Sequence, residues 1–316
     1  WAPRQVGDED TNPLPSFVGL PINDISGFES RLVLLAGPNV IMSRTKFPED
    51  FFKRSAVALI DSDPIDQKST KDGSVELNWI IQFDRDLILL SDPGDSQYVV
   101  SGGGITPENA SIVLTTSYEM YGQAKPVTTG RTIVFPFLSG VWSGLKEFFT
   151  NDVVATNGAD TLTEVQDKYI TGEVDNLVSS KNFNTIALTT DSTDYNNRIW
   201  IYKYLWAGTE RRQASWSYWE VKDEVMYMFF KNAALYIVVK DEFDDIYATQ
   251  INLNKPFDTE GWHVTLDRKT SEVLAGDTIT REFSGATIVQ STGCLNPGRE
   301  TIPVSSVQSG NTWIYT

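Results

Sequence analysis

The sequence of 316 residues predicts an all-β protein, with a propeller-like array of antiparallel blades and a smaller β domain. Short apolar runs bounded by Gly, Pro, Asn and Asp recur along the chain, and long helical periods are scarce. A unit of several such runs begins near positions 31, 79, 131, 184 and 225, a spacing of roughly 40 to 55 residues. Propeller blades have this spacing because each buries its faces against its neighbours. No clear motif repeats, so a pair of β-sandwiches is the alternative.

The first two units each read as a hairpin, because two apolar runs flank residues that favour turns. Gly37, Pro38 and Asn39 form the first turn, and Asp84, Arg85 and Asp86 form the second. A third strand follows the turn at 92–95 in the second unit. The strands expected here are 31–36, 40–43, 79–83, 87–90 and 97–100.

The remaining units follow the same pattern. Pro136 and Gly140 separate the runs of the third unit, and turns at 207–209 and 231–232 separate those of the later units. The expected strands are 132–135, 140–142, 145–149, 184–188, 199–205, 215–219, 225–230, 235–239 and 246–253. Residues 48–58 and 160–169 are the two segments with the composition of a short helix.

Three regions are expected. Residues 1–30 form an extended anchoring segment, because three prolines exclude regular structure in the first nineteen residues while the aromatic residues there are too apolar for a solvated tail. Residues 31–254 form the propeller-like domain. Residues 255–316, where composition changes, form part of a second small β domain. The missing initiator Met suggests a fragment or a cleaved product.

Composition excludes several classes of protein. One cysteine, Cys294, and one histidine, His263, exclude a disulfide framework and zinc sites of the Cys/His type. Neither a metal nor a cofactor is expected. No run reaches the roughly 20 apolar residues of a membrane helix. The net charge of −16 argues against a surface that grips nucleic acid. It fits a wall past which DNA slides without sticking, and it fits equally an acidic surface that only keeps the protein soluble.

Acidic clusters are the only plentiful candidates for chemistry. Asp61, Asp63 and Asp66 surround Pro64 and have two readings: acid–base or calcium chemistry, or a turn in which carboxylates accept backbone amides, which we favour. A denser run lies between two strong strands and is either a solvated hairpin loop or an acidic rim of a DNA channel. It comprises Asp241, Glu242, Asp244 and Asp245.

Other candidates are weaker. Asp191, Asp194, Asn196 and Asn197 form a polar loop. The Gly102–Gly104 run lacks the residues of a phosphate-binding loop, and the Asn109 glycosylation pattern is a frequent chance match. Tryptophans crowd one region, where core packing is a commoner use than a sugar or base platform. They are Trp200, Trp206, Trp216 and Trp219.

The first residues carry a family resemblance. The run Trp-Ala-Pro-Arg, followed by Asp-Glu-Asp-Thr-Asn-Pro-Leu-Pro-Ser-Phe, resembles the nozzle proteins (tail tubular protein B) of short-tailed, podovirus-type phages. Shorter echoes follow at 40–44, 201–205 and 215–219, so the likeness covers residues 1–254, patchily after 66. The motif residues, expected in packing or subunit contact, are Trp1, Pro3, Arg4, Asp8, Glu9, Asp10, Pro13, Pro15 and Phe17.

The resemblance implies a structural subunit of the virion tail without catalytic activity. It implies a homohexameric ring below an adaptor protein, with tail fibres as further partners and a lumen through which viral DNA is ejected into the host. A second hypothesis is a propeller that binds or degrades host surface polysaccharide through carboxylate pairs and tryptophan platforms. Only poor carboxylate pairs, such as Asp61 with Asp63 or Asp241 with Asp244, support it.

Overall fold

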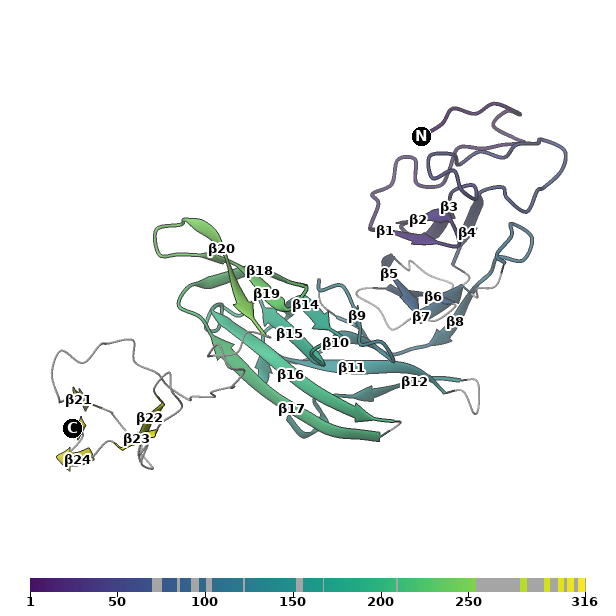
Figure 1. The fold of residues 1–316 in the computed structure, drawn as a ribbon. Coiled ribbons are helices and arrows are strands. Elements are labelled where there is room, and N and C mark those ends of the chain that lie inside the picture. Colours follow the sequence, from purple (N-terminus) through teal and green to yellow (C-terminus); the bar gives the residue numbers. More distant parts are fainter. Residues whose placement is uncertain are drawn as a thin grey trace. The chain divides into compact units, whose positions relative to one another are not determined.

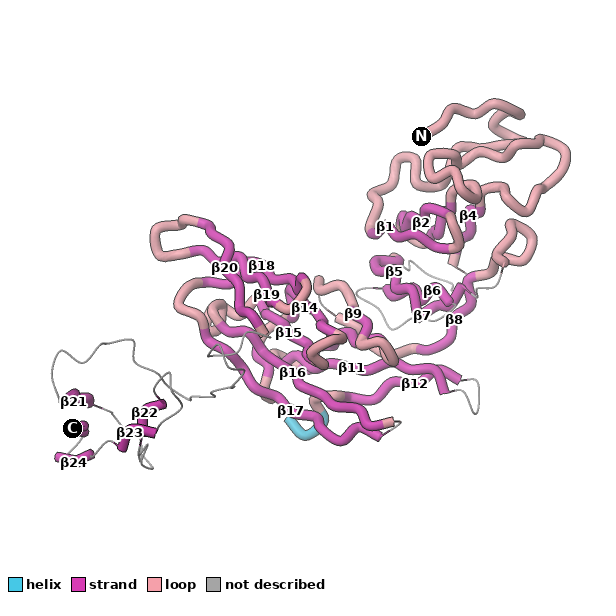
Figure 2. Tube along the Cα trace, in the orientation of Figure 1, coloured by secondary structure: helices cyan, strands magenta, loops and turns pink. Residues whose placement is uncertain are grey.

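A computed structural model describes two compact units, Trp1–Leu253 and Asn254–Thr316. It covers the chain apart from residues 70–75, 84–85, 92–96, 101–103, 122, 152–155, 167, 209, 254–278, 283–292, 296–300, 304–305, 310–311 and 316. The protein is all-β with several antiparallel sheets, as predicted (Figure 1). The only helix among the described residues is the 3₁₀ turn Glu164–Gln166 (Figure 2).

The first unit contains five consecutive antiparallel sheets. Sheet 1 comprises β1 (Asp24–Phe28), β2 (Arg31–Ala36), β3 (Asn39–Met42) and β4 (Ile65–Lys68). Sheet 2 comprises β5 (Leu77–Phe83), β6 (Asp86–Ser91), β7 (Gln97–Val100) and β8 (Ile112–Thr116). Sheet 3 comprises β9 (Val127–Thr128), β10 (Ile133–Ser139), β11 (Trp142–Asn151), β12 (Thr156–Thr161) and β13 (Ile170–Thr171).

Sheet 4 comprises β14 (Val174–Ser180), β15 (Thr185–Thr190), β16 (Arg198–Ala207) and β17 (Glu210–Glu220). Sheet 5 comprises β18 (Glu224–Lys231), β19 (Ala234–Lys240) and β20 (Ile246–Asn252). Within each sheet, hydrogen-bonded neighbours follow one another in the sequence, and β13 of sheet 3 pairs additionally with β11. Each sheet is therefore a meander of local hairpins.

The recurring unit of the sequence corresponds to these sheets. Their first strands begin at residues 24, 77, 127, 174 and 224. The predicted starts came later wherever the first strand is polar or short, as in β1, which includes Ser26 and Gly27. Because β1 lies within residues 1–30, regular structure begins before the end of the expected anchoring segment.

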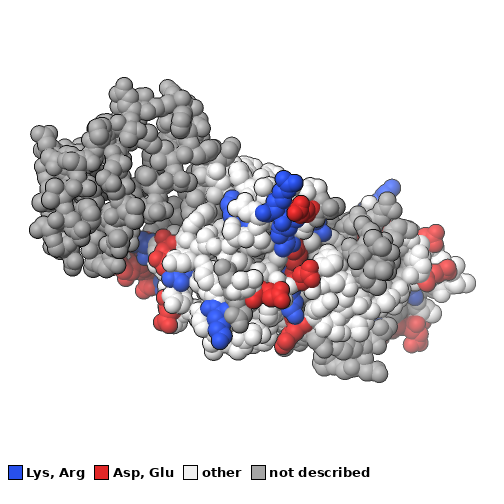
Figure 3. All heavy atoms as spheres, turned by 90° about the horizontal axis from the view of Figure 1, so that it is seen from below, with Lys and Arg blue, Asp and Glu red and all other residues white. Residues whose placement is uncertain are grey.

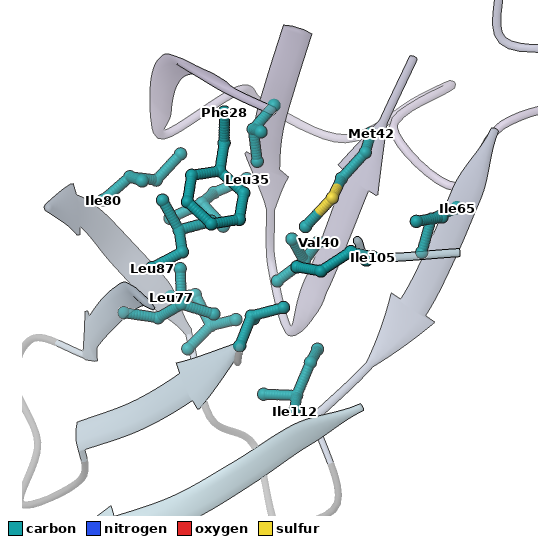
Figure 4. Packing of buried hydrophobic residues seen from close by; sticks show 13 residues of the cluster. Phe28, Leu35, Val40, Met42, Ile65, Leu77, Ile80, Leu87, Ile105 and Ile112 are labelled. Atoms are coloured by element: carbon teal, nitrogen blue, oxygen red, sulfur yellow. The ribbon is translucent and has the colours of Figure 1, made fainter. Parts of the chain in front are cut away.

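Each sheet in the middle of the series contributes to two apolar layers. Leu87 and Leu89 of β6 pack with sheet 1, in a cluster with Val33, Leu35 and Met42 (Figure 4). The alternate residues of β6 join a different cluster with sheet 3. Side chains of successive strand residues point to opposite faces, so a strand buried on both faces is apolar throughout.

The same alternation continues through sheets 3 and 4. In β10, Ile133 and Phe135 pack toward sheet 2, whereas Val134 joins the cluster shared with sheet 4. In sheet 4, Ile186 belongs to that same cluster, whereas Ala187 belongs to the cluster shared with sheet 5. Four apolar layers therefore join the five sheets in sequence order.

Three local expectations are wrong. Pro136 does not end a strand but lies within β10, opposite Leu145 of β11. Only Ile133 and Val134 of β10 pair with β9, so the missing N–H of Pro136 removes no hydrogen bond between β9 and β10. Residues 48–58 form turns instead of a helix, because side chains of Asp50 and Ser55 accept the local backbone N–H groups. In the described part of 160–169, Asp160 and Thr161 end β12, and the helical structure is limited to the 3₁₀ turn Glu164–Gln166.

The described residues of the second unit form two small sheets. One is ordered β21 (Ile279–Glu282), β25 (Thr312–Tyr315), β24 (Ser306–Ser309), and the other pairs β22 (Gly293–Leu295) with β23 (Thr301–Pro303). Several sequence expectations lie outside the described residues: the turns at 84–85 and 92–95, Gly102, Gly103 and His263. The side chain of Cys294 lies outside them as well, although its backbone is part of β22.

Candidate assembly surfaces and acidic loops

The N-terminal segment packs on the face of sheet 1 that points away from sheet 2. Phe17 and Phe51 join Leu34 and Ile41 in an apolar cluster there. Phe17 contacts the Phe51 ring edge-to-face at 5.1 Å between centroids and the Trp1 ring at the same distance. Trp1 itself is 62% exposed. The motif thus supplies one buried ring and one surface ring.

Polar contacts attach the same segment at several points. Asn12 is buried; its side-chain amide donates to the carbonyl oxygens of Val6 and Lys53, and its oxygen accepts the Lys53 N–H at 3.0 Å. The backbone N–H of Ser16 donates to Asp66 at 2.8 Å. The guanidinium of Arg4 lies 5.4 Å from the centre of the Phe52 ring. Apart from its place in the motif, nothing in the sequence marks Asn12 as a buried residue.

The acidic residues of the motif form an exposed turn. The Asp8 carboxylate accepts hydrogen bonds from the Thr11 side chain at 2.8 Å and from the backbone N–H groups of Asp10 and Thr11. These bonds, chiefly that of the Thr11 hydroxyl, lower the pKa of Asp8 from its ordinary value. Glu9, Asp10, Pro3 and Pro13 are exposed, whereas Pro15 is buried.

The Asp61–Asp66 cluster organises a loop. The buried Asp63 carboxylate accepts the backbone N–H groups of Arg54 and Ile60, which confirms the predicted turn. Arg31, also buried, donates to the carbonyl oxygens of Ser43, Asp61 and Asp63. Desolvation by burial lowers the pKa of Arg31. These contacts hold both ends of the segment 54–63.

The tip of that segment is exposed and apolar. We call residues Ala56–Ile60 the aliphatic loop; their sequence is Ala-Val-Ala-Leu-Ile. Val57 is 98% exposed, and Leu59 and Ile60 are each more than 40% exposed. The Ser55 hydroxyl accepts the N–H groups of Val57 and Ala58, which orders the loop from within. Solvent-exposed aliphatic residues in an ordered loop are typical of contact surfaces.

The Asp241–Asp245 run forms the hairpin loop between β19 and β20, as predicted. The Asp241 carboxylate accepts the backbone N–H groups of Phe243 and Asp245. Lys240 forms an ion pair with Asp244 at 2.6 Å, and this hydrogen-bonded contact lowers the pKa of Asp244. Glu242 and Asp245 are exposed, and so is Phe243 at the tip. On the face seen in Figure 3, acidic and basic side chains are interspersed.

One face of sheet 5 is apolar and exposed. In β18 and β19, Met228 and Ile237 point toward sheet 4, so the register places Tyr227, Phe229, Tyr236 and Val238 on the opposite side. Phe229 and Tyr236 stack at 5.2 Å between centroids. Two residues of β20, Ile246 and Ala248, extend this set. We call these six residues the terminal face.

The tryptophans pack within the sheets. Trp200 is buried, with the rings of Tyr169 and Tyr218 edge-to-face against it at 4.9 and 5.8 Å. The Trp216 indole donates to the Leu162 carbonyl oxygen at 3.2 Å, and Trp206 lies under the Arg211 guanidinium. Trp219 packs against the cluster between sheets 4 and 5. The prediction of core packing is confirmed for this group.

A partly buried ion pair joins sheets 3 and 4, and nothing in the sequence indicated it. Glu147 of β11 is buried, pairs with Arg211 of β17 and accepts a hydrogen bond from Thr132 at 2.8 Å. Tyr204 is also buried, and its own burial raises the pKa of its hydroxyl group to about 12. A glutamate in an otherwise ordinary strand segment gives no signal of burial, because its partner lies 64 residues further along the chain.

The remaining polar candidates also support the fold. Asp191 accepts the Glu173 backbone N–H at 2.7 Å, and the Asn196 and Asn197 carbonyl oxygens accept N–H groups of Val225 and Val221. Asp194 is exposed. The Asn109 side chain donates to the Gly104 carbonyl oxygen, as in a local turn.

In the described part of the chain, no three His, Cys, Asp or Glu residues are placed to hold a metal ion. No helix among the described residues is long and apolar enough to cross a membrane.

The fold and its surfaces define a class: an all-β protein of consecutive antiparallel sheets with exposed apolar surfaces. Within that class, residues 1–311 match the family described as bacteriophage nozzle protein. The chain is 30% identical over 267 residues to the tail tubular protein gp12 of Escherichia phage T7. The chain belongs to the bacteriophage nozzle protein family and is a component of the phage tail. The resemblance read from the first residues is confirmed.

The aligned region covers 83% of this chain and 33% of the T7 protein, so the chain spans about a third of that relative. Likeness to solved structures is lower. A chain of the S. cerevisiae Dbp5–Nup159–Gle1 assembly is 13% identical with a TM-score of 0.44, covering 76% of this chain and 61% of that one. Kluyveromyces lactis Hsv2 is 11% identical with a TM-score of 0.40, covering 93% and 96%. Scores of this size assign no fold.

Proposed function

We propose that the chain is a structural, non-enzymatic part of a phage tail nozzle, in which copies surround a channel that conducts viral DNA into the host. The match of residues 1–311 to the nozzle family carries this proposal. A series of sheets joined by apolar layers is suited to a wall that bears load, because sheets 2, 3 and 4 are each packed against a neighbouring sheet on both faces.

The finer architecture belongs to the same proposal. The five meanders are arranged as blades of a propeller-like array, and six copies form a ring that meets an adaptor protein and tail fibres in the virion. Consecutive sheets that pack face to face in sequence order support the blade arrangement. Residues 1–30, 31–254 and 255–316 act as the anchoring segment, the propeller-like domain and part of a second domain.

The excess of acidic over basic residues is part of this proposal, because it would keep DNA from sticking to the channel. A net charge of −16 repels the phosphate backbone, so DNA passes without sticking. The loop of Asp241, Glu242, Asp244 and Asp245 is the proposed acidic rim. The carbohydrate hypothesis loses its support, because Trp200 and Trp216 are packed within the sheets and Asp63 is engaged in a turn.

The deciding experiment is the mass of the purified chain by light scattering, together with particle images of the same sample. Sixfold rings with an open centre are expected. In such rings, replacing the four acidic residues of the rim by lysine should make the particles retain duplex DNA. A compact monomer with activity in a reducing-sugar assay on capsular polysaccharide would overturn the proposal.

A further inference from the structure

We propose that the aliphatic loop of one copy docks on the terminal face of a second copy, so that copies associate head to tail. The inference rests on the proposed function, because a ring needs contacts of this kind. A heterologous contact joins two different surfaces of the same protein, and such contacts close into rings when the rotation between copies allows it.

The aliphatic loop is suited to docking without rearrangement. Asp63 and Arg31 hold its base through buried hydrogen bonds, and Ser55 orders its interior. Val57 therefore stands exposed on an ordered backbone rather than on a mobile tip. A surface ordered before binding loses little conformational entropy when it binds.

The terminal face offers a matching apolar surface. Tyr227 is 55% exposed and Ile246 is 64% exposed, and the stacked Phe229 and Tyr236 extend the face beyond Tyr227 on the side away from Ile246. The opposite side of the same strands packs against sheet 4, where Met228 and Ile237 are 0% exposed. Sheet 5 thus presents an aromatic face to solvent.

Charge favours a second copy as the occupant. The aliphatic loop is flanked by the basic Arg54 on one side and the exposed acidic Asp61 on the other. The terminal face is bounded by Lys231 at one end and by the acidic loop of Glu242 and Asp245 at the other. Opposite charges therefore meet when the Arg54 side of the loop lies over the acidic end.

The test uses the chain of residues 1–316 and two charged variants, Val57→Glu and Ile246→Lys. Each places a charge in the proposed apolar contact, and we expect each to lower the association constant by about tenfold or more. The measurement is sedimentation velocity across a concentration series. Val165→Glu and Val141→Lys are matched controls, because both valines are highly exposed elsewhere (96% and 68%), and both should associate like the parent chain.

Proximity is tested separately, so a folding defect in one variant does not decide the result. In a Cys294→Ser background, a Val57→Cys chain mixed with an Ile246→Cys chain should be joined by a short thiol cross-linker, whereas neither alone should be joined. Rings that persist in both charged variants, or failure to cross-link, would overturn this contact and leave the nozzle function standing. A parent chain that never associates would overturn the contact and the proposed ring together.

Discussion

At the scale of single residues, buried polar side chains hold the irregular parts of this protein. Asn12 and Arg31 each bridge backbone groups that have no strand partner. A buried backbone group without a partner costs free energy, so a proline-rich segment can remain packed only if side chains supply the missing bonds. This explains how residues 1–19 are ordered without helix or strand.

Asn12→Ala should lower the free energy of unfolding by about 2 kcal/mol, because it removes three hydrogen bonds and leaves the Lys53 N–H and two carbonyl oxygens without their partner. Urea unfolding followed by tryptophan fluorescence measures the change. Glu9→Gln, at an exposed position of the same segment, is the control and should have no effect. An Asn12→Ala chain as stable as the parent would show that the segment does not depend on this side chain.

The Glu173 carboxyl predicts a pH dependence. Burial, and secondarily the charge of Asp191, raise the pKa of Glu173 in the folded chain. The folded state then binds this proton more tightly than the unfolded state, so the contribution to stability is largest below the unfolded pKa and is lost as pH rises through the folded pKa. Glu173→Gln should gain stability over the parent at neutral pH and match it near pH 4, about the ordinary pKa of a glutamate. Equal melting profiles of the two chains at both pH values would contradict this.

At the scale of elements, the apolar content of a strand decides whether it can be predicted from the sequence. Strands β2, β6 and β19 are apolar on both faces and were predicted to within two residues. Strands β4 and β12 were missed, because Ile-Asp-Gln-Lys and Thr-Asn-Gly-Ala-Asp-Thr have the composition of loops. Their strand geometry comes from pairing with β3 and β11, which tertiary structure supplies.

Sheets 3 and 4 should depend on the pair Glu147 and Arg211. Glu147→Ala should destabilise the chain by about 3 kcal/mol, because it leaves the guanidinium half-buried without its carboxylate. The double variant Glu147→Leu with Arg211→Met should recover most of this loss, since two apolar groups of similar size can replace a buried pair. Thermal unfolding of the single and double variants measures the coupling. A double variant less stable than the single one would contradict this view.

At the scale of the whole molecule, net charge and apolar packing act on different surfaces. The apolar layers lie between the sheets, whereas the excess of acidic residues lies on the outside. Acidic and basic groups are interspersed on the face in Figure 3, so no basic stripe that would grip a duplex is visible there. In the proposed conduit, the apolar layers would supply strength and the acidic surface would prevent DNA from sticking.

The chain should fail to retard duplex DNA in a gel at roughly 0.1 M salt, because it offers few clustered cations to replace the counterions of DNA. Lowering the salt should not restore binding, since weaker screening strengthens the repulsion between like charges. The measurement is electrophoretic mobility across a salt series, with a basic protein as the positive control. Retardation that increases as salt falls would show a cationic surface and contradict the conduit reading.

The sequence by itself determined the β class, the recurring unit and the family. Apolar runs and turn residues are local properties, and the motif from Trp1 to Phe17 is specific. Only the tertiary structure decided which residues are buried in pairs, such as Glu147 with Arg211, and which apolar residues remain exposed, such as Val57 and Tyr227. The physical reason is that burial depends on neighbours from distant strands, and nothing in a residue's own segment records whether such a neighbour is present.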